Sequence, residues 1–131
     1  MWRWLRGIRE RRDAQAAEHV DAVHAECIDN PSLVLVRVVK VYQKARRGTK
    51  AIVVHEDDGR PQDTWFERMR PRVGSYYLVQ RCSAWGPHNS NPDTLYVHWI
   101  GAHLTRRMVK AANRHHRRWE KAGYRASAHG R

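Results

Sequence analysis

The spacing of apolar side chains changes from helical to alternating and back again along the chain. Near the N-terminus, apolar residues recur at intervals of four, three and four, at Ala16, Val20, Val23 and Cys27. This spacing places one apolar stripe on an α-helix, and we assign residues 1–30 to an N-terminal helix or arm. Pro31 ends the helix, because proline restricts the residue before it and cannot continue the backbone hydrogen-bond ladder.

Residues 33–104 have the pattern of a sheet. Residues 33–42 are nearly all β-branched or aliphatic, which is typical of a strand that is covered on both faces for part of its length. Four further strands are predicted between turns rich in Gly, Pro, Asp and Asn, at 50–55, 64–69, 75–82 and 95–100. The pattern predicts an α+β protein with a small five-stranded, mostly antiparallel twisted sheet or partly closed barrel (OB/SH3-like), flanked by an N-terminal and a C-terminal helix.

The helical period returns after Gly101. Apolar or aromatic side chains recur at intervals of four, three, four and three, at Met108, Ala112, His115, Trp119 and Ala122. We predict a basic helix over 105–123 that ends at Gly123, because glycine readily adopts the left-handed conformation that follows many helices. Residues 124–131 are expected to form a flexible tail, and residues 1–131 together a single domain.

The charge of the chain points to a polyanionic partner. Lysine and arginine number 25 against 13 aspartate and glutamate residues, which gives a formal net charge of +12. Such a charge attracts polyanions, so nucleic acid, either DNA or RNA, is the first partner to consider. The alternative is that the excess charge serves solubility alone.

The cysteines and the first residues indicate a reducing compartment. A chain of 131 residues needs no disulfide to fold, so we expect Cys27 and Cys82 to be reduced. Arginines interrupt the apolar residues of 1–8, which therefore resemble neither a signal peptide nor a membrane span. We expect a protein of the cytoplasm, or of a particle assembled there, with no membrane partner.

The predicted C-terminal helix concentrates positive charge. The candidate phosphate-binding residues are Arg106, Arg107, Lys110, Arg114, Arg117 and Arg118. Like charges three and four residues apart destabilise a helix, so a partner that supplies negative charge would offset that cost. Phosphates or an acidic protein surface would both serve, and the alternative is a face that is merely solvated.

Aromatic residues are interleaved with arginines in the predicted sheet. Bases of single-stranded nucleic acid stack on such rings while cations hold the backbone, although core packing explains most of the rings equally well. Trp85 and Tyr96 are the candidates for stacking. Trp85 lies in a long predicted loop, and Tyr96 points away from the face that carries Leu95 and Val97.

Neither a metal site nor a catalytic site is predicted. The nine histidines and two cysteines show no close ligand spacing, so we expect no metal and no cofactor. Five carboxylates around one hairpin, Glu56, Asp57, Asp58, Asp63 and Glu67, would suit a magnesium-dependent nuclease, but most of them belong to a turn that favours aspartate for backbone reasons. No phosphate loop or nucleophile motif is present, so we do not expect an enzyme.

The first residues form a candidate docking arm. Trp2, Trp4, Leu5 and Ile8 alternate with arginines, and tryptophan and arginine are enriched at the centres of protein interfaces. Two hypotheses follow. The first is a non-enzymatic nucleic-acid-binding module that contacts phosphates with low sequence specificity. The alternative is a structural or assembly protein, for example a phage virion component, that docks onto acidic protein surfaces and forms a homo- or hetero-oligomer.

Overall fold

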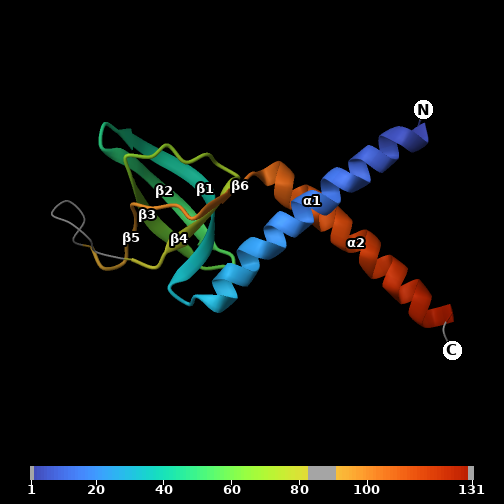
Figure 1. Cartoon of the computed structure of the whole chain (residues 1–131). Helices are drawn as coiled ribbons and strands as arrows, with labels where there is room; N and C mark the ends of the chain where they lie inside the picture. The colour runs from blue at the N-terminus through green and yellow to red at the C-terminus, as the bar shows by residue number, and fades with distance from the viewer. Residues whose placement is uncertain (1, 83–90, 130–131) are drawn as a thin grey trace. The chain divides into compact units, whose positions relative to one another are not determined.

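The computed structural model describes residues 2–82 and 91–129, and it describes side chains as far as residue 123. The chain forms two compact units (Figure 1). Residues 1–22 and 106–131 make a helical unit, and residues 23–105 make a sheet unit. Within the described part of the chain, neither helix has a stretch long and apolar enough to cross a membrane.

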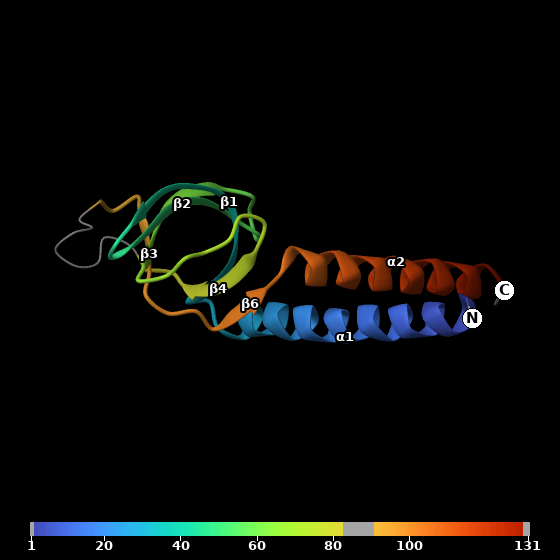
Figure 2. The same ribbon diagram turned by 90° about the horizontal axis from the view of Figure 1, so that it is seen from above.

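Two crossing helices make up the helical unit. α1 (Trp2–Asp29) begins in this unit and ends in the sheet unit, and α2 (Arg106–His129) belongs to the helical unit throughout. The helices cross in Figure 1 and lie in adjacent layers in Figure 2. The buried apolar residues of this unit are small ones, Ala17, Val20, Ala111 and Ala112. We predicted that this helix ends at Gly123, but α2 continues to His129. Glycine costs a helix only about 1 kcal/mol and does not by itself end it.

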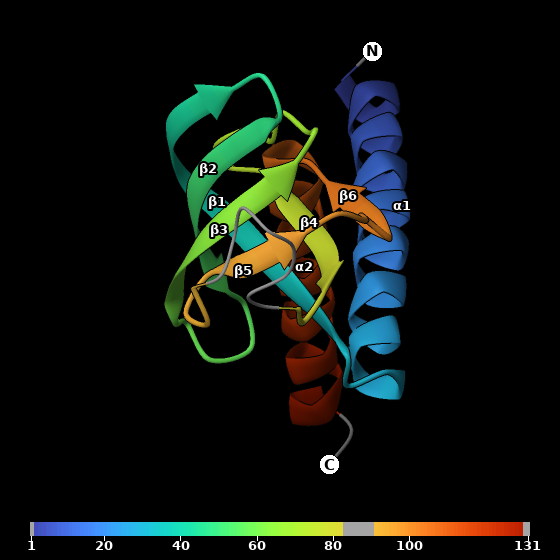
Figure 3. The same ribbon diagram turned by 90° about the vertical axis from the view of Figure 1, so that its left-hand side faces the viewer.

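The sheet unit contains six strands. They are β1 (Leu33–Ala45), β2 (Gly48–His55), β3 (Pro61–Glu67), β4 (Tyr76–Gln80), β5 (Leu95–Val97) and β6 (Ala102–Leu104). Their hydrogen-bonded order is β5-β3-β2-β1-β4-β6. β1, β2 and β3 form an antiparallel meander, β4 pairs antiparallel with the other edge of β1, and β5 runs parallel beside β3 (Figure 3).

The predicted α+β class is confirmed, whereas the predicted strand count and barrel closure are wrong. The sheet is mixed and open, and it has six strands because the segment predicted as one strand over 95–100 is split into β5 and β6. At the break the Trp99 ring lies over Gly101, where a Cβ atom would be 2.5 Å from the ring. Gly101 also donates its backbone N–H to the Leu78 carbonyl oxygen at 2.8 Å. The chain thus leaves the edge beside β3 and joins the edge beside β4.

Alternation along the strands separates a core face from an outer face. The core cluster consists of Val34, Val36, Val38, Ala51, Val53, Phe66, Tyr77, Val79, Leu95 and Val97. In β3, Thr64 and Phe66 are buried while Trp65 between them is half-buried, as the two-residue period of a strand requires. The outer face therefore keeps aromatic and charged side chains in contact with solvent.

Substituting Gly48 with alanine is expected to lower the free energy of unfolding by about 1–3 kcal/mol, the usual cost of overpacking. A Cβ atom at Gly48 would collide with the Phe66 carbonyl oxygen and lie 2.7 Å from the Trp65 ring. Gly7→Ala is the matched control, because its nearest neighbour would be the end of Arg11 at 3.9 Å and alanine favours a helix. Urea denaturation followed by circular dichroism measures both variants. Equal stability of the two would contradict the close packing at Gly48.

Candidate nucleic-acid interface

Four arginines line a hollow on the sheet unit, and we call this hollow the arginine pocket. Its lining residues are Arg46, Arg47, Arg68 and Arg70, and its volume is about 770 Å³. Arg46 and Arg47 form the turn between β1 and β2, and the other two follow the end of β3. Four guanidinium groups around one concave surface give a strongly positive local potential, which attracts phosphate groups.

Arg70 holds the pocket together. Its guanidinium donates hydrogen bonds to three atoms that flank the β1–β2 turn: the Ala45 carbonyl oxygen at 2.6 Å, the Gly48 carbonyl oxygen at 2.8 Å and the Thr49 hydroxyl at 2.9 Å. The Thr49 hydroxyl in turn donates to the Met69 carbonyl oxygen at 2.6 Å. These bonds tie the turn to the segment after β3, so the pocket is formed before any ligand arrives.

Arg68 has a backbone conformation that arginine rarely adopts. Its φ is +54°, in the left-handed region, which costs a residue with a side chain roughly 1–2 kcal/mol. A backbone hydrogen bond from Arg68 N to the Arg47 carbonyl oxygen at 2.8 Å accompanies this conformation. Arg46 and Arg68 are both exposed, so their side chains are available to a ligand.

Two aromatic rings lie beside the arginine pocket on the outer face of the sheet. Trp65 of β3 is the register partner of Lys50 in β2 and of Tyr96 in β5, so the three side chains share one face. The Trp65 ring covers Gly48, the residue whose carbonyl oxygen is bound by Arg70. The arginine pocket and the Trp65–Tyr96 pair are therefore neighbouring parts of one surface.

Glu67 fixes both rings. Its carboxylate accepts a hydrogen bond from the Trp65 indole N–H at 2.5 Å and another from the Tyr96 hydroxyl. Burial, followed by the charge and hydrogen bond of Glu67, raises the pKa of Tyr96 above its usual value.

The cations predicted on the C-terminal helix have two different surroundings. Arg114 and Arg118 donate hydrogen bonds to the buried Asp13 carboxylate at 3.1 Å and 2.5 Å. This carboxylate neutralises part of their positive charge within the helical unit. Of the cations predicted to contact phosphates, Arg106, Arg107, Lys110 and Arg117 are exposed. Contact of these four residues with phosphates remains a prediction.

The other predicted site residues also differ in their surroundings. Tyr96 is half-buried on the outer face, opposite to the buried Leu95 and Val97, as predicted. Trp85 lies outside the described residues. The docking-arm residues Trp2, Trp4 and Leu5 are 85%, 66% and 50% exposed, and Ile8 is half-buried.

The arginine pocket was not predicted from the sequence. Its members form two short pairs, Arg46-Arg47 and Arg68-x-Arg70, which are separated by the whole β2–β3 hairpin. The register that pairs Gly48 with Glu67 brings the two arginine pairs together. A strand register for the predicted hairpin could have revealed the pocket, because it places the residues before Gly48 beside the residues after Glu67. Cys27 and Cys82 are both free thiols, and burial raises the pKa of Cys27.

Comparisons with known proteins give no relative for this chain. No protein-family model, curated protein or solved structure matches it. Its role is therefore inferred from its own residues.

Proposed function

We propose that the protein is a non-enzymatic nucleic-acid-binding module that contacts phosphates with low sequence specificity. The observation that carries this proposal is the arginine pocket with the Trp65–Tyr96 pair beside it. Guanidinium groups bind phosphate oxygens in a forked geometry, and rings next to a row of phosphates offer bases a surface for stacking. The net charge of +12 attracts any polyanion toward this surface.

The chemistry of the pocket accounts for the low specificity. Every nucleotide carries the same phosphate, so contacts to phosphates fix the position of the strand but carry no base information. Stacking is equally tolerant, because every base has an aromatic face. The exposed cations of α2, among them Arg106 and Arg107, are proposed to add further phosphate contacts.

The strand connectivity gives independent support. A meander of β1, β2 and β3, with β4 against β1 and β5 parallel to β3, has the strand pairing of an OB fold, although here the sheet is open and contains a sixth strand. A backbone hydrogen bond from Tyr96 N to the Cys82 carbonyl oxygen at 2.7 Å joins β5 to the segment after β4. In OB folds the face of strands 2 and 3 and the loop after strand 1 contact oligonucleotides. The Trp65 face and the Arg46-Arg47 turn have these positions here.

The test is fluorescence anisotropy of the purified chain with labelled single- and double-stranded DNA and RNA at two salt concentrations, with heparin as competitor. We expect submicromolar binding that persists at physiological salt and weakens along a straight line in a plot of log affinity against log salt. Binding that disappears at physiological salt, or that heparin removes as readily as an unlabelled oligonucleotide does, would reduce the proposal to generic charge attraction.

The exposed N-terminal tryptophans favour the alternative role as an assembly protein. Trp2 and Trp4 are 85% and 66% exposed, and Trp119 on α2 is 66% exposed. Large exposed rings flanked by arginines are typical of protein interfaces. A chain that sediments as an oligomer and shows no preference for oligonucleotides over heparin would favour this alternative.

A further inference from the structure

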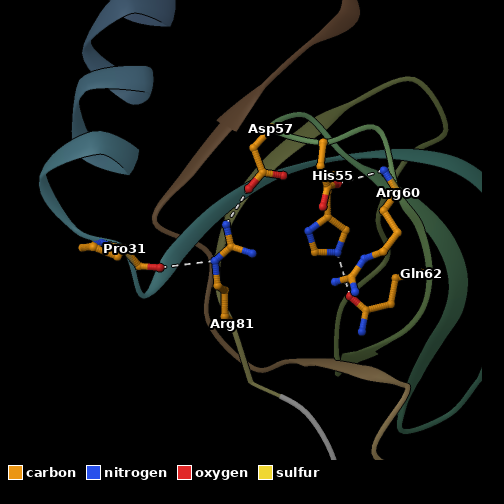
Figure 4. Close-up of polar contacts among 7 residues, drawn as sticks. Pro31, His55, Asp57, Arg60, Gln62 and Arg81 are labelled. Carbon is orange, nitrogen blue, oxygen red and sulfur yellow. Dashed lines mark hydrogen bonds and ion pairs between the residues drawn. The ribbon is translucent and has the colours of Figure 1, made fainter.

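A buried histidine and two exposed aspartates converge at the turn between β2 and β3. His55 is the last residue of β2 and is 2% exposed, and Asp57 and Asp58 follow it in the turn. One ring nitrogen of His55 and one carboxylate oxygen of each aspartate lie within 4.8 Å of one another. Figure 4 shows His55 and Asp57 in this turn, with Arg81 beside them.

The hydrogen bonds around His55 determine which ring nitrogen is available. Nε2 lies 2.7 Å from the Gln62 side-chain oxygen, and the Gln62 amide nitrogen donates to the Asp93 carbonyl oxygen at 3.1 Å. Because the Gln62 oxygen only accepts hydrogen bonds, His55 Nε2 carries the proton. In the neutral ring Nδ1 then has a lone pair, and it is buried with no hydrogen-bond partner among the described residues.

The unpartnered Nδ1 atom lies near charged side chains. The ring edge that carries Nδ1 faces away from Gln62, on the side of the Asp57–Arg81 ion pair (Figure 4). The buried Nδ1 has no hydrogen-bond partner among the described residues, and a buried polar atom without a partner costs stability. Of the two aspartates, Asp57 pairs with Arg81 at 2.6 Å, and Asp58 accepts a backbone hydrogen bond from Arg60 at 2.9 Å.

We propose that His55 Nδ1, Asp57 and Asp58 bind a divalent first-row transition metal ion such as Zn²⁺, with water completing its coordination. Imidazole and carboxylate ligands bind Zn²⁺ at about 2.0–2.2 Å in a tetrahedral arrangement, so two of its ligand atoms are about 3.4 Å apart. Both aspartates are exposed, so small rotations of their side chains close the remaining distance and leave the ion an entry path.

The neighbours of these three residues have the roles expected around a metal site. A metal-bound histidine usually donates its other ring N–H to an acceptor that fixes the orientation of the ring, and the Gln62 oxygen is in that position. Arg81 donates to Asp57 and also to the Pro31 carbonyl oxygen at 3.2 Å, so it orients one carboxylate from a fixed point (Figure 4). The site is independent of the nucleic-acid-binding proposal, because none of its residues lines the arginine pocket.

The test is a calorimetric titration of the full chain with Zn²⁺ alone, together with NMR of the histidine ring nitrogens. Because the chain has nine histidines, the variant comparison and the NMR signal of His55 separate this site from other zinc binding. Asp57→Asn/Asp58→Asn is the test variant, since asparagine keeps the turn, and we expect it to weaken the tightest site about tenfold or more. Glu56→Gln is the control, because it removes a neighbouring charge that pairs with Arg37.

The expected result is one tight site in the wild type and in Glu56→Gln, with a large shift of the His55 Nδ1 resonance on addition of Zn²⁺. Two results would overturn the proposal. One is equal Zn²⁺ affinity in the wild type and in the doubly substituted variant. The other is saturation with Zn²⁺ without any change at His55 Nδ1, which would assign the binding to other histidines.

Discussion

Replacing Asp13 with alanine is expected to lower the free energy of unfolding by about 2–4 kcal/mol. The Asp13 side chain is only 2% exposed and accepts hydrogen bonds from Arg114 and Arg118 of α2. Alanine would leave two neighbouring guanidinium groups without their counter-charge. Breaking a fully buried pair costs about 3–5 kcal/mol, and solvent reduces that figure here because the two arginine side chains are 34% and 39% exposed.

Urea denaturation followed by circular dichroism measures this effect, and Asp21→Ala is the matched control. Asp21 also lies on α1 and pairs with His116 of α2, but its side chain is 58% exposed. An exposed pair contributes about 0.5 kcal/mol or less, so this variant should stay close to the wild type. Equal losses in the two variants would show that the burial of Asp13 does not decide the strength of its contacts.

The same carboxylate makes stability depend on pH. Burial alone would raise the pKa of Asp13, but the hydrogen bonds and charges of Arg114 and Arg118 outweigh burial and hold the pKa below its usual value of 3.8. A carboxyl whose pKa is lowered by folding contributes fully above its unfolded pKa and loses its contribution as the pH falls through the folded pKa. The wild type should therefore lose this contribution below about pH 4, and Asp13→Ala should lack that part of the acid dependence.

The double substitution Arg46→Gln/Arg68→Gln is expected to weaken oligonucleotide binding about 25-fold near 0.1 M salt. Each phosphate contact contributes about 0.7 to the slope of log affinity against log salt for a single strand, which is a factor of about five at this salt concentration. Both arginines are exposed in the arginine pocket, so their loss removes contacts without opening the core. The slope should become shallower by about 1.4. Anisotropy titrations at several salt concentrations measure both quantities.

Two further double variants remove the same charge elsewhere. Lys40→Gln/Arg60→Gln changes exposed residues of the sheet unit that do not line the arginine pocket, and it should bind nearly as the wild type does. Arg106→Gln/Arg107→Gln tests the contribution of α2. If all three variants lose the same affinity, overall charge and not the pocket governs binding, and the site assignment is wrong.

The helices and the first four strands could be predicted because their causes are local. The β-branched run after Pro31 and the turns at Arg47-Gly48 and Asp58-Gly59 act within a few residues, and the sequence shows them directly. The split into β5 and β6 has a distant cause. It depends on the packing of Trp99 over Gly101 and on a bond to Leu78 in another strand, which no local pattern reveals.

The candidate site was predictable only in part, for the same reason. The outward position of Tyr96 follows from alternation within one strand, and the structure agrees with it. The arginine pocket depends on the register between β2 and β3, and the pairing of Asp13 with Arg114 joins residues 101 positions apart. The pairing of Arg114 and Arg118 with the buried Asp13 carboxylate could not be predicted, because no nearby residue in the sequence indicates it.

The two outermost strands of the sheet have a consequence for association. β5 and β6 form the edges of the sheet, and each is three residues long. A long, flat edge strand presents a row of unpaired backbone groups onto which other chains add, and short edges are one of the ways in which natural proteins prevent such growth. The short edge strands β5 and β6 therefore offer little template for fibre formation.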